Sequence, residues 1–320
     1  MTFADHGIGA EEKETAARPE KAGDGYGGIV RFGRFPVKKE RGFSSMELAT
    51  RFGGNSTAYR QDTPLDDNQL RRIAPSIFAE HPHESRTERY GYIPTIAVLD
   101  GLRREGFQPF MVAQSRCRDE GKTEYTKHML RLRHPGQIMG EMTPEIVLIN
   151  SHDGTSSYQM MAGIFRLVCQ NGLVAGDVVE DIRVRHSGGN IVDDVIEAAY
   201  EVVDGFDRVA GSIEEMRATS LTLPEKIAFA DAALALKYED RAPIAAQQLL
   251  RPRRSEDADN NLWATLNLCQ ENLVKGGLKG RSASGRRTTT RPVRSIDGDV
   301  RLNKALWILA DRMAELKRAN

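Results

Sequence analysis

The residues best suited to chemistry form one polar run, Asn150-Ser-His-Asp-Gly-Thr-Ser-Ser157, between two apolar, strand-like segments. Loops at the end of a sheet often carry binding or catalytic groups. His152 and Asp153 could act there as a general acid and base. A simpler interpretation is an ordinary turn, because Asp-Gly is a strong hairpin signal and Asn and Asp side chains satisfy turn backbones. A third interpretation is a surface in which Ser151 and His152 contact nucleic acid.

Histidine and cysteine could also supply a metal site or a nucleophile. Six of the seven histidines lie between residues 81 and 186, but no His-x-x-x-His or Cys-x-x-Cys spacing brings three or four ligands together. Cys169 could pair with His152 as a thiol and imidazole. Cys169 stands in a core-strand pattern, however, where a buried thiol is usually inert. We therefore predict no metal and no cofactor.

A second feature is a basic, glycine-rich segment near the C-terminus. Residues 275–294 contain seven Lys or Arg and no Asp or Glu. Glycine lets a backbone approach a partner closely, and Lys, Arg, Ser and Thr side chains all donate to phosphate. The segment is either a nucleic-acid contact or a solvated linker between two helices. The predicted contacts are Lys275, Lys279, Arg281, Arg286, Arg287 and Arg291.

A third feature combines aromatic and basic residues around Tyr90 and Tyr92. Single-strand binders pair a cationic groove with aromatic platforms for base stacking. The competing interpretation is that these aromatic side chains pack in the core. Strand pairing would also place Cys169-Gln-Asn-Gly172, read as a hairpin turn, beside the Asn150 loop. The remaining predicted contacts are Arg86, Arg89, Tyr90, Tyr92, Lys127, Arg131, Arg133, Gln170 and Asn171.

Composition limits the class of protein. The 320 residues carry 45 basic and 45 acidic side chains, so the net charge gives no overall attraction to nucleic acid and basic charge must act as a local patch. No apolar run approaches the roughly 18–20 residues that span a bilayer, and the first residues show no secretory signal pattern. We expect a cytoplasmic protein without a membrane contact. Three distant cysteines argue against a disulfide framework.

Hydrophobic periodicity predicts an α+β fold: a curved antiparallel sheet with a packed helix layer, then a helical C-terminal half. We expect a disordered extension over 1–45, an α+β domain over 46–220 and a helical region over 221–320 that contains the basic loop 275–294. Helices are expected from Thr63, from Thr95 to a cap at Gly106, and from Asn190. Further helices are expected at about 224–237, 243–250, 260–275 and 298–318. Strands are expected at 107–117, 125–133, 145–150, 157–161, 164–174 and 178–186.

Several of these segments resemble a known family. They are His83-Glu-Ser-Arg-Thr-Glu-Arg-Tyr-Gly-Tyr-Ile-Pro-Thr95, Val168-Cys-Gln-Asn-Gly172, Glu271-Asn-Leu-Val-Lys-Gly-Gly-Leu278 and the segments 106–110, 126–133, 150–159 and 296–307. Together they resemble the YfjQ/YafZ/YubP group of plasmid- and prophage-borne proteins, which carries a domain of unknown function. The resemblance runs from about Met46 to the C-terminus. It implies a mobile-element context and brings no catalytic assignment.

These observations favour an accessory protein of a plasmid or prophage that binds DNA, with single-stranded DNA as the expected partner and annealing or protection as the activity. One alternative is an enzyme that acts on nucleic acid or nucleotides through His152 and Asp153. Another is an interaction protein that inhibits a host defence factor. Homo-oligomer formation stays open, as does the choice between DNA and RNA.

Overall fold

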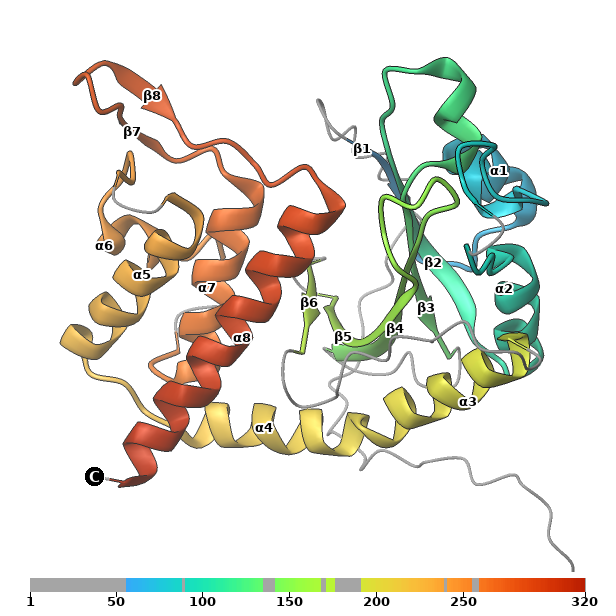
Figure 1. Cartoon of the computed structure of the whole chain (residues 1–320). Helices are drawn as coiled ribbons and strands as arrows, with labels where there is room; N and C mark the ends of the chain where they lie inside the picture. Colours follow the sequence, from blue (N-terminus) through green and yellow to red (C-terminus); the bar gives the residue numbers. More distant parts are fainter. Residues whose placement is uncertain are drawn as a thin grey trace, which may run out of the picture. The chain divides into compact units, whose positions relative to one another are not determined.

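A six-stranded antiparallel sheet forms the centre of the fold (Figure 1). Its strands lie side by side in chain order, so each pairs with the one before it, and the predicted antiparallel meander is confirmed. The first strand, β1, is an edge strand that the sequence pattern did not predict. The strands are β1 (Ser56–Arg60), β2 (Gln108–Ser115), β3 (His128–Arg133), β4 (Met142–Asn150), β5 (Gln159–Arg166) and β6 (Asn171–Val174).

This computed structural model describes part of the chain, and all of that part belongs to one compact unit, Phe32–Asn320. The described residues are 56–87, 90–134, 142–167, 171–175, 191–238, 241–254 and 259–319. The predicted extension 1–45, the predicted strand 178–186 and the residues Arg89, Cys169 and Gln170 lie outside them.

The region after β4 differs from the prediction. β5 runs through Gly163 without a break, although two strands were expected there. A Cβ at Gly163 would lie 2.7 Å from Cγ2 of Val147, so this glycine admits a close neighbour and does not mark a turn. Gly172 likewise pairs with Phe165 inside β6, so Asn171-Gly172 is not the predicted hairpin turn.

Helices cover one side of the sheet. They are α1 (Asp67–Ile73), the short 3-10 helices η1 (Pro75–Phe78) and η2 (Glu120–Tyr125), α2 (Thr95–Arg104) and α3 (Ile191–Asp204). α2 begins at Thr95 as predicted, and Gly106 follows it with φ of +90°. The first helix begins later than the predicted Thr63. Asp66 caps it, because its side chain accepts from the Gln69 N–H while the Gln69 side chain accepts from the Asp66 N–H.

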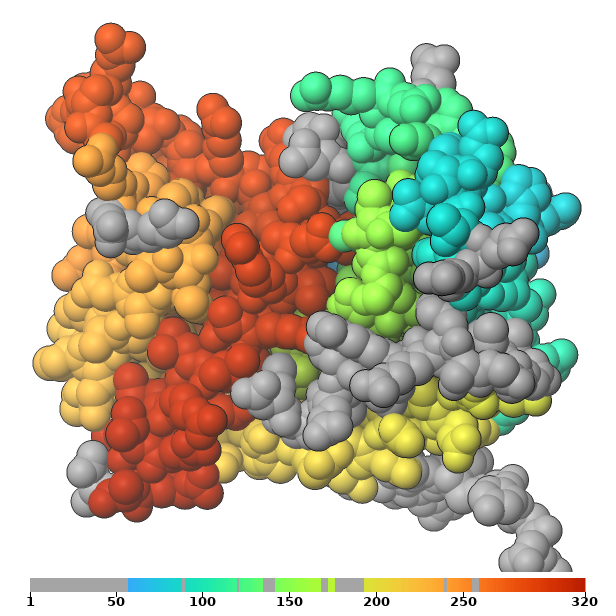
Figure 2. Space-filling model, in the orientation of Figure 1, coloured from blue at the N-terminus to red at the C-terminus, as the bar shows by residue number. Residues whose placement is uncertain are grey.

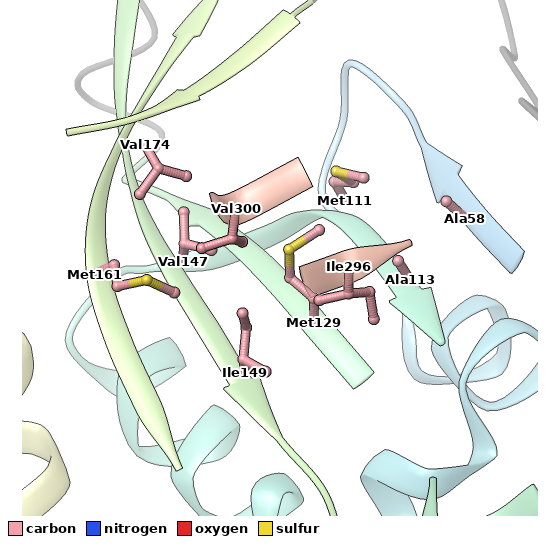
Figure 3. Close-up of a cluster of buried hydrophobic side chains, with 10 residues drawn as sticks. All are labelled: Ala58, Met111, Ala113, Met129, Val147, Ile149, Met161, Val174, Ile296 and Val300. Atoms are coloured by element: carbon pink, nitrogen blue, oxygen red, sulfur yellow. The ribbon is translucent and has the colours of Figure 1, made fainter. Parts of the chain in front are cut away.

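The opposite side of the sheet is covered by the last helix, α8 (Ile296–Ala319). Figure 3 shows Ile296 and Val300 of α8 against apolar side chains from all six strands of the sheet. The cluster consists of Ala58, Met111, Ala113, Met129, Val147, Ile149, Met161, Val174, Ile296 and Val300. The C-terminal helix therefore completes the core of a sheet built from residues more than a hundred positions earlier.

The rest of the C-terminal half is helical, as predicted. It contains α4 (Phe206–Ala218), α5 (Leu223–Tyr238), α6 (Ala246–Leu249) and α7 (Leu262–Lys275). α4 was not predicted, although Phe206, Val209, Ile213 and Met216 bury one face of it at helical spacing. Between α7 and α8 a small hairpin forms from β7 (Lys279–Arg281) and β8 (Arg287–Thr289). Within the described part of the chain, no helix is both long and apolar enough to cross a membrane.

Candidate functional site

The first three residues of the polar run are buried, whereas Gly154, Thr155 and Ser157 are exposed. Asn150, Ser151 and His152 expose 3% or less of their surface, because the loop folds back onto η1 and the start of α2. The backbone secures this fold: His83 N–H donates to the His152 carbonyl, and His152 N–H donates to the Tyr125 carbonyl. The predicted exposed tip is therefore wrong for Ser151 and His152, and neither side chain reaches a surface that nucleic acid could contact.

Instead, the run joins a hydrogen-bonded network beneath the helix layer. Ser76 Oγ donates to Gln114 Oε1 (2.7 Å) and so accepts from His128 Nδ1 (2.8 Å). This assignment leaves His128 Nε2 as the acceptor for Thr95 Oγ1 at 2.9 Å. Thr95 Oγ1 in turn accepts from Asn150 Nδ2 at 2.9 Å. The pattern requires a neutral His128 with its proton on Nδ1.

Burial keeps both histidines of this network neutral. Burial, and then the neighbouring His152, lower the pKa of His128 to about 3, against a backbone hydrogen bond to Thr126. Burial lowers the pKa of His152 to about 4, although the Ser76 backbone and Asp153 act in the opposite direction. The two rings lie 5.3 Å apart, centre to centre. Neutral, enclosed rings of this kind specify the packing of the core, and a macromolecular substrate would not reach them.

Asp153 shapes the turn. Its Oδ1 accepts from the Thr155 N–H (2.9 Å) and from Thr155 Oγ1 (2.6 Å), and Gly154 follows with φ of +75°. We expect Asp153→Ala to lower the free energy of unfolding by about 1 kcal/mol, the usual cost of a lost local side-chain bond, and to leave nucleic-acid affinity unchanged. Urea unfolding and a binding titration of the same variant check this. A variant of full stability that loses an activity would restore Asp153 as a catalytic candidate.

The tyrosines of the aromatic and basic segment hold loops together. Tyr90 donates its hydroxyl to the Ser151 carbonyl at 2.7 Å, and Tyr92 donates to the Ala79 carbonyl. Both are partly buried, and burial raises the pKa of Tyr92 to about 12. Arg86 is exposed and lies over Gly154, where a Cβ would come within 2.5 Å of its Nη1. Of this segment, Arg86 keeps the exposed position that the predicted contact requires.

The basic residues of β3 point into the protein. Arg131 and Arg133 are each 1% exposed, and both pair with Glu145, which is fully buried. Arg131 Nη1 lies 2.9 Å from Glu145 Oε2, and Arg133 Nε lies 2.8 Å from Oε1. Burial opposes ionisation, but Arg133 and Arg131 hold the pKa of Glu145 below its ordinary value. The predicted groove contacts at Arg131 and Arg133 are therefore wrong. Arg131 lies 3.5 Å from Asp299 of α8, and the Arg133 guanidinium lies over the rings of Phe110 and Phe165.

Two further predicted contacts are placed elsewhere. Lys127 Nζ donates to both carboxylate oxygens of Asp297 at the start of α8 (2.7 and 2.8 Å). Asn171 pairs with Arg166, and Arg166 pairs with Met142 at the opposite end of β4 from Asn150. Asn171 therefore does not lie beside the Asn150 loop, because β6 returns along β5 from its far end.

The basic segment folds as the hairpin β7–β8, which projects past α6 (Figures 1 and 2). Its cations Lys279, Arg281, Arg286 and Arg287 are exposed, as is Arg291 behind β8. Within the described residues, none of these five forms an ion pair, whereas Lys275 pairs with Glu271 at 2.7 Å. The structure thus brings together five of the predicted basic contacts on one exposed hairpin and its C-terminal flank.

The base of the hairpin is held in place by hydrogen bonds and close backbone packing. Lys237 Nζ donates to the carbonyls of Leu273 (2.6 Å) and Arg291 (2.7 Å), which join the end of α7 to the strand that follows β8. Gly276 has φ of +62°, and a Cβ there would lie 2.7 Å from the Arg291 backbone. These contacts hold the backbone of the segment against the end of α7, so the segment is a folded hairpin and not a solvated linker.

Comparisons with known proteins agree on one family. The family model described as "Domain of unknown function (DUF932)" matches residues 82–307. Two Escherichia coli (strain K12) proteins are similar over 267 residues, which is 83% of this chain and 97% of each relative. They are "UPF0380 protein YafZ", with 55% identity, and "UPF0380 protein YfjQ", with 54%. No solved structure matches the chain.

Proposed function

We propose that this protein, which belongs to the DUF932 family, binds nucleic acid along the phosphate backbone through the hairpin β7–β8. The resemblance to YfjQ and YafZ that its motifs predicted is confirmed. The names of these relatives state no activity, so the proposal rests on the hairpin. The observation that carries it is the exposure of Lys279, Arg281, Arg286 and Arg287 on one two-stranded ribbon, with no ion-pair partner among the described residues.

The hairpin suits duplex DNA better than a single strand. A two-stranded β-ribbon fits the width of the major groove, where its basic side chains meet the flanking phosphates. Single-strand binders add aromatic platforms on which bases stack, and residues 275–294 contain no Phe, Tyr or Trp. Tyr90 and Tyr92, the platforms expected from the sequence, have their hydroxyls bonded to loop carbonyls. We therefore propose duplex DNA as the preferred partner.

The proposal includes a role in a mobile element. The resemblance to plasmid- and prophage-borne proteins favours DNA as the nucleic-acid partner. Contacts restricted to phosphate would bind DNA of any sequence. Such binding suits a protein that coats or protects DNA without reading a particular site. The expected specificity is therefore low and the dependence on salt is strong.

Replacing Arg286, Arg287 and Arg291 together with Ala should weaken binding to a labelled duplex and flatten its dependence on salt. Each lost phosphate contact removes about 0.9 from the slope of log affinity against log salt concentration, so three contacts remove about 2.7. Titrations of the duplex and of its separated strand at several salt concentrations measure both quantities.

The matched control is Arg72→Ala, which removes an exposed arginine from α1 in the helix layer. It should leave both affinity and slope as they are in the natural protein. An unchanged slope in the triple variant, at unchanged thermal stability, would contradict the proposal and leave the hairpin as a structural element. A larger loss for the single strand than for the duplex would restore the single-stranded partner expected from the sequence.

A further inference from the structure

A shallow hollow lies beside the turn of the hairpin. It is lined by Arg241, Ala242, Arg281, Ser282 and Ala283. Two of these side chains are exposed guanidinium groups from segments forty residues apart: Arg241 follows α5, and Arg281 ends β7. The sequence gives no sign that they meet, because only the way the hairpin lies on the α5–α6 connection brings them to one place.

Close backbone contact produces this meeting. The Arg281 N–H donates to the Pro243 carbonyl at 2.8 Å, which ties β7 to the residues that follow Arg241. A Cβ at Gly280 would lie 2.0 Å from the same carbonyl oxygen, a separation no side chain permits. Glycine at position 280 is therefore required for the hairpin to lie where Arg281 and Arg241 line one hollow.

The turn of the hairpin orients the Arg281 side chain. Arg281 Nη1 donates to the Gly285 carbonyl at 3.0 Å, which draws the guanidinium back along the hairpin turn. Gly285 has φ of +76°, and its N–H donates to the Ser282 carbonyl to close the turn. One nitrogen of the Arg281 guanidinium therefore bonds within the hairpin, while the Arg281 side chain remains exposed where it lines the hollow.

We infer that this hollow seats one phosphate of the bound nucleic acid, with the guanidinium groups of Arg241 and Arg281 as donors and the Ser282 hydroxyl as a third. The inference rests on the proposed function, which it deepens by adding Arg241 to the contacts. A guanidinium group presents a planar fork of N–H donors that matches two phosphate oxygens, which a lysine ammonium does not. A phosphate seated beside the hairpin turn fixes its register, while Arg286 and Arg287, which lie across from Ser282 and Arg281 in the hairpin, reach neighbouring phosphates.

The test compares single variants of the full chain in duplex titrations. Arg241→Ala should weaken binding about threefold to tenfold, as expected for an exposed charge-assisted hydrogen bond, and lower the salt slope by about 0.9. Arg241→Lys should keep the slope and recover only part of the affinity, because the charge returns without the fork. Arg72→Ala again serves as the control for the loss of an exposed arginine.

A second variant alters the geometry without removing a charge. Gly280→Ala should push the hairpin away from Pro243 and weaken duplex binding by a similar factor, although every cation is still present. Its matched control is Gly211→Ala, at an exposed position in α4 where a Cβ meets no atom within 4 Å, which should bind normally. Thermal unfolding of both variants shows that the rest of the fold is intact.

The outcomes separate the inference from the function it rests on. If the triple hairpin variant loses salt dependence while Arg241→Ala and Gly280→Ala bind like the natural protein, the phosphate seat is wrong and the proposed function stands. If neither the triple variant nor Arg241→Ala changes binding, the phosphate seat and the proposed function are both wrong. NMR of the arginine side chains with inorganic phosphate adds an independent measure. Arg241 and Arg281 signals that shift with phosphate but not with the duplex would overturn the inference in favour of a free-anion site.

Discussion

Glu145→Gln should lower the free energy of unfolding by about 3–5 kcal/mol, the usual cost of removing one partner from a buried ion pair. Gln keeps the shape of the side chain and removes its charge. Arg131 and Arg133, each 1% exposed, would then share no buried carboxylate, and Asp299 at 3.5 Å from Arg131 would be the nearest remaining acid in the described network. The expected loss of stability is large because buried positive charge would be left without its partner.

The same substitution at an exposed pair gives the control. Glu315 pairs with Arg312 at 2.7 Å in α8, where the two side chains are 48% and 65% exposed. Glu315→Gln should change stability by less than about 0.5 kcal/mol, because water screens an exposed pair. Urea unfolding of both variants measures the difference. Equal, small effects would mean that water reaches Glu145 and that the network around it is not enclosed.

Acid should destabilise the protein well before its carboxylates titrate. The pKa values of His128 and His152 are lowered in the folded state to about 3 and about 4, whereas an unfolded histidine titrates near 6.5. Below pH 6.5 the unfolded chain therefore binds protons that the folded chain excludes, and stability falls as the pH falls. Between pH 7 and pH 5 each histidine should cost about 2 kcal/mol, so the pair should cost about 4 kcal/mol.

Unfolding free energies at pH 7 and pH 5 test this. His128→Gln and His152→Gln should each be less stable at pH 7, because a hydrogen bond or ring contact is lost, and each should show about half of the pH dependence of the natural protein. His81→Gln removes an exposed histidine and should keep the full dependence. A natural protein whose stability is flat between pH 7 and pH 5 would show that the two rings take up protons while folded.

Local patterns were enough for the class of fold and for most of its elements. Short apolar runs bounded by turn residues predicted the antiparallel meander, and the 3.6-residue period predicted α2, α5, α7 and α8. Within the sheet, β1 was missed, Asn171-Gly172 of β6 was taken for a turn, and β5 was divided in two because Gly163 looked like a boundary. It lies in mid-strand because Val147 on the neighbouring strand leaves no room for a side chain. That reason belongs to a residue sixteen positions away, which no local window contains.

In the candidate site, too, local sequence predicted some features and long-range contacts decided others. The basic composition of 275–294 was visible in the sequence, and the structure places its cations on an exposed hairpin. Arg131 and Arg133, predicted as nucleic-acid contacts, alternate with Leu130 and Leu132 in the sequence, so those contacts required the polar side of this strand to face solvent. That side is instead buried, because Glu145 supplies the counter-charge and α8, which begins at Ile296, supplies the cover.

The alternation of side chains along a strand shows which residues share a face, and for β3 it placed Arg131 and Arg133 correctly on one face. Whether a polar face meets water or a buried partner depends on segments that are distant in sequence and that only the folded chain brings near. The same holds for His152, which η1 and α2 enclose, and for Arg241, which lines one hollow with Arg281 because Gly280 admits the Pro243 carbonyl. Element type follows from short-range backbone and side-chain preferences, whereas burial, charge pairing and the composition of a site follow from long-range contacts.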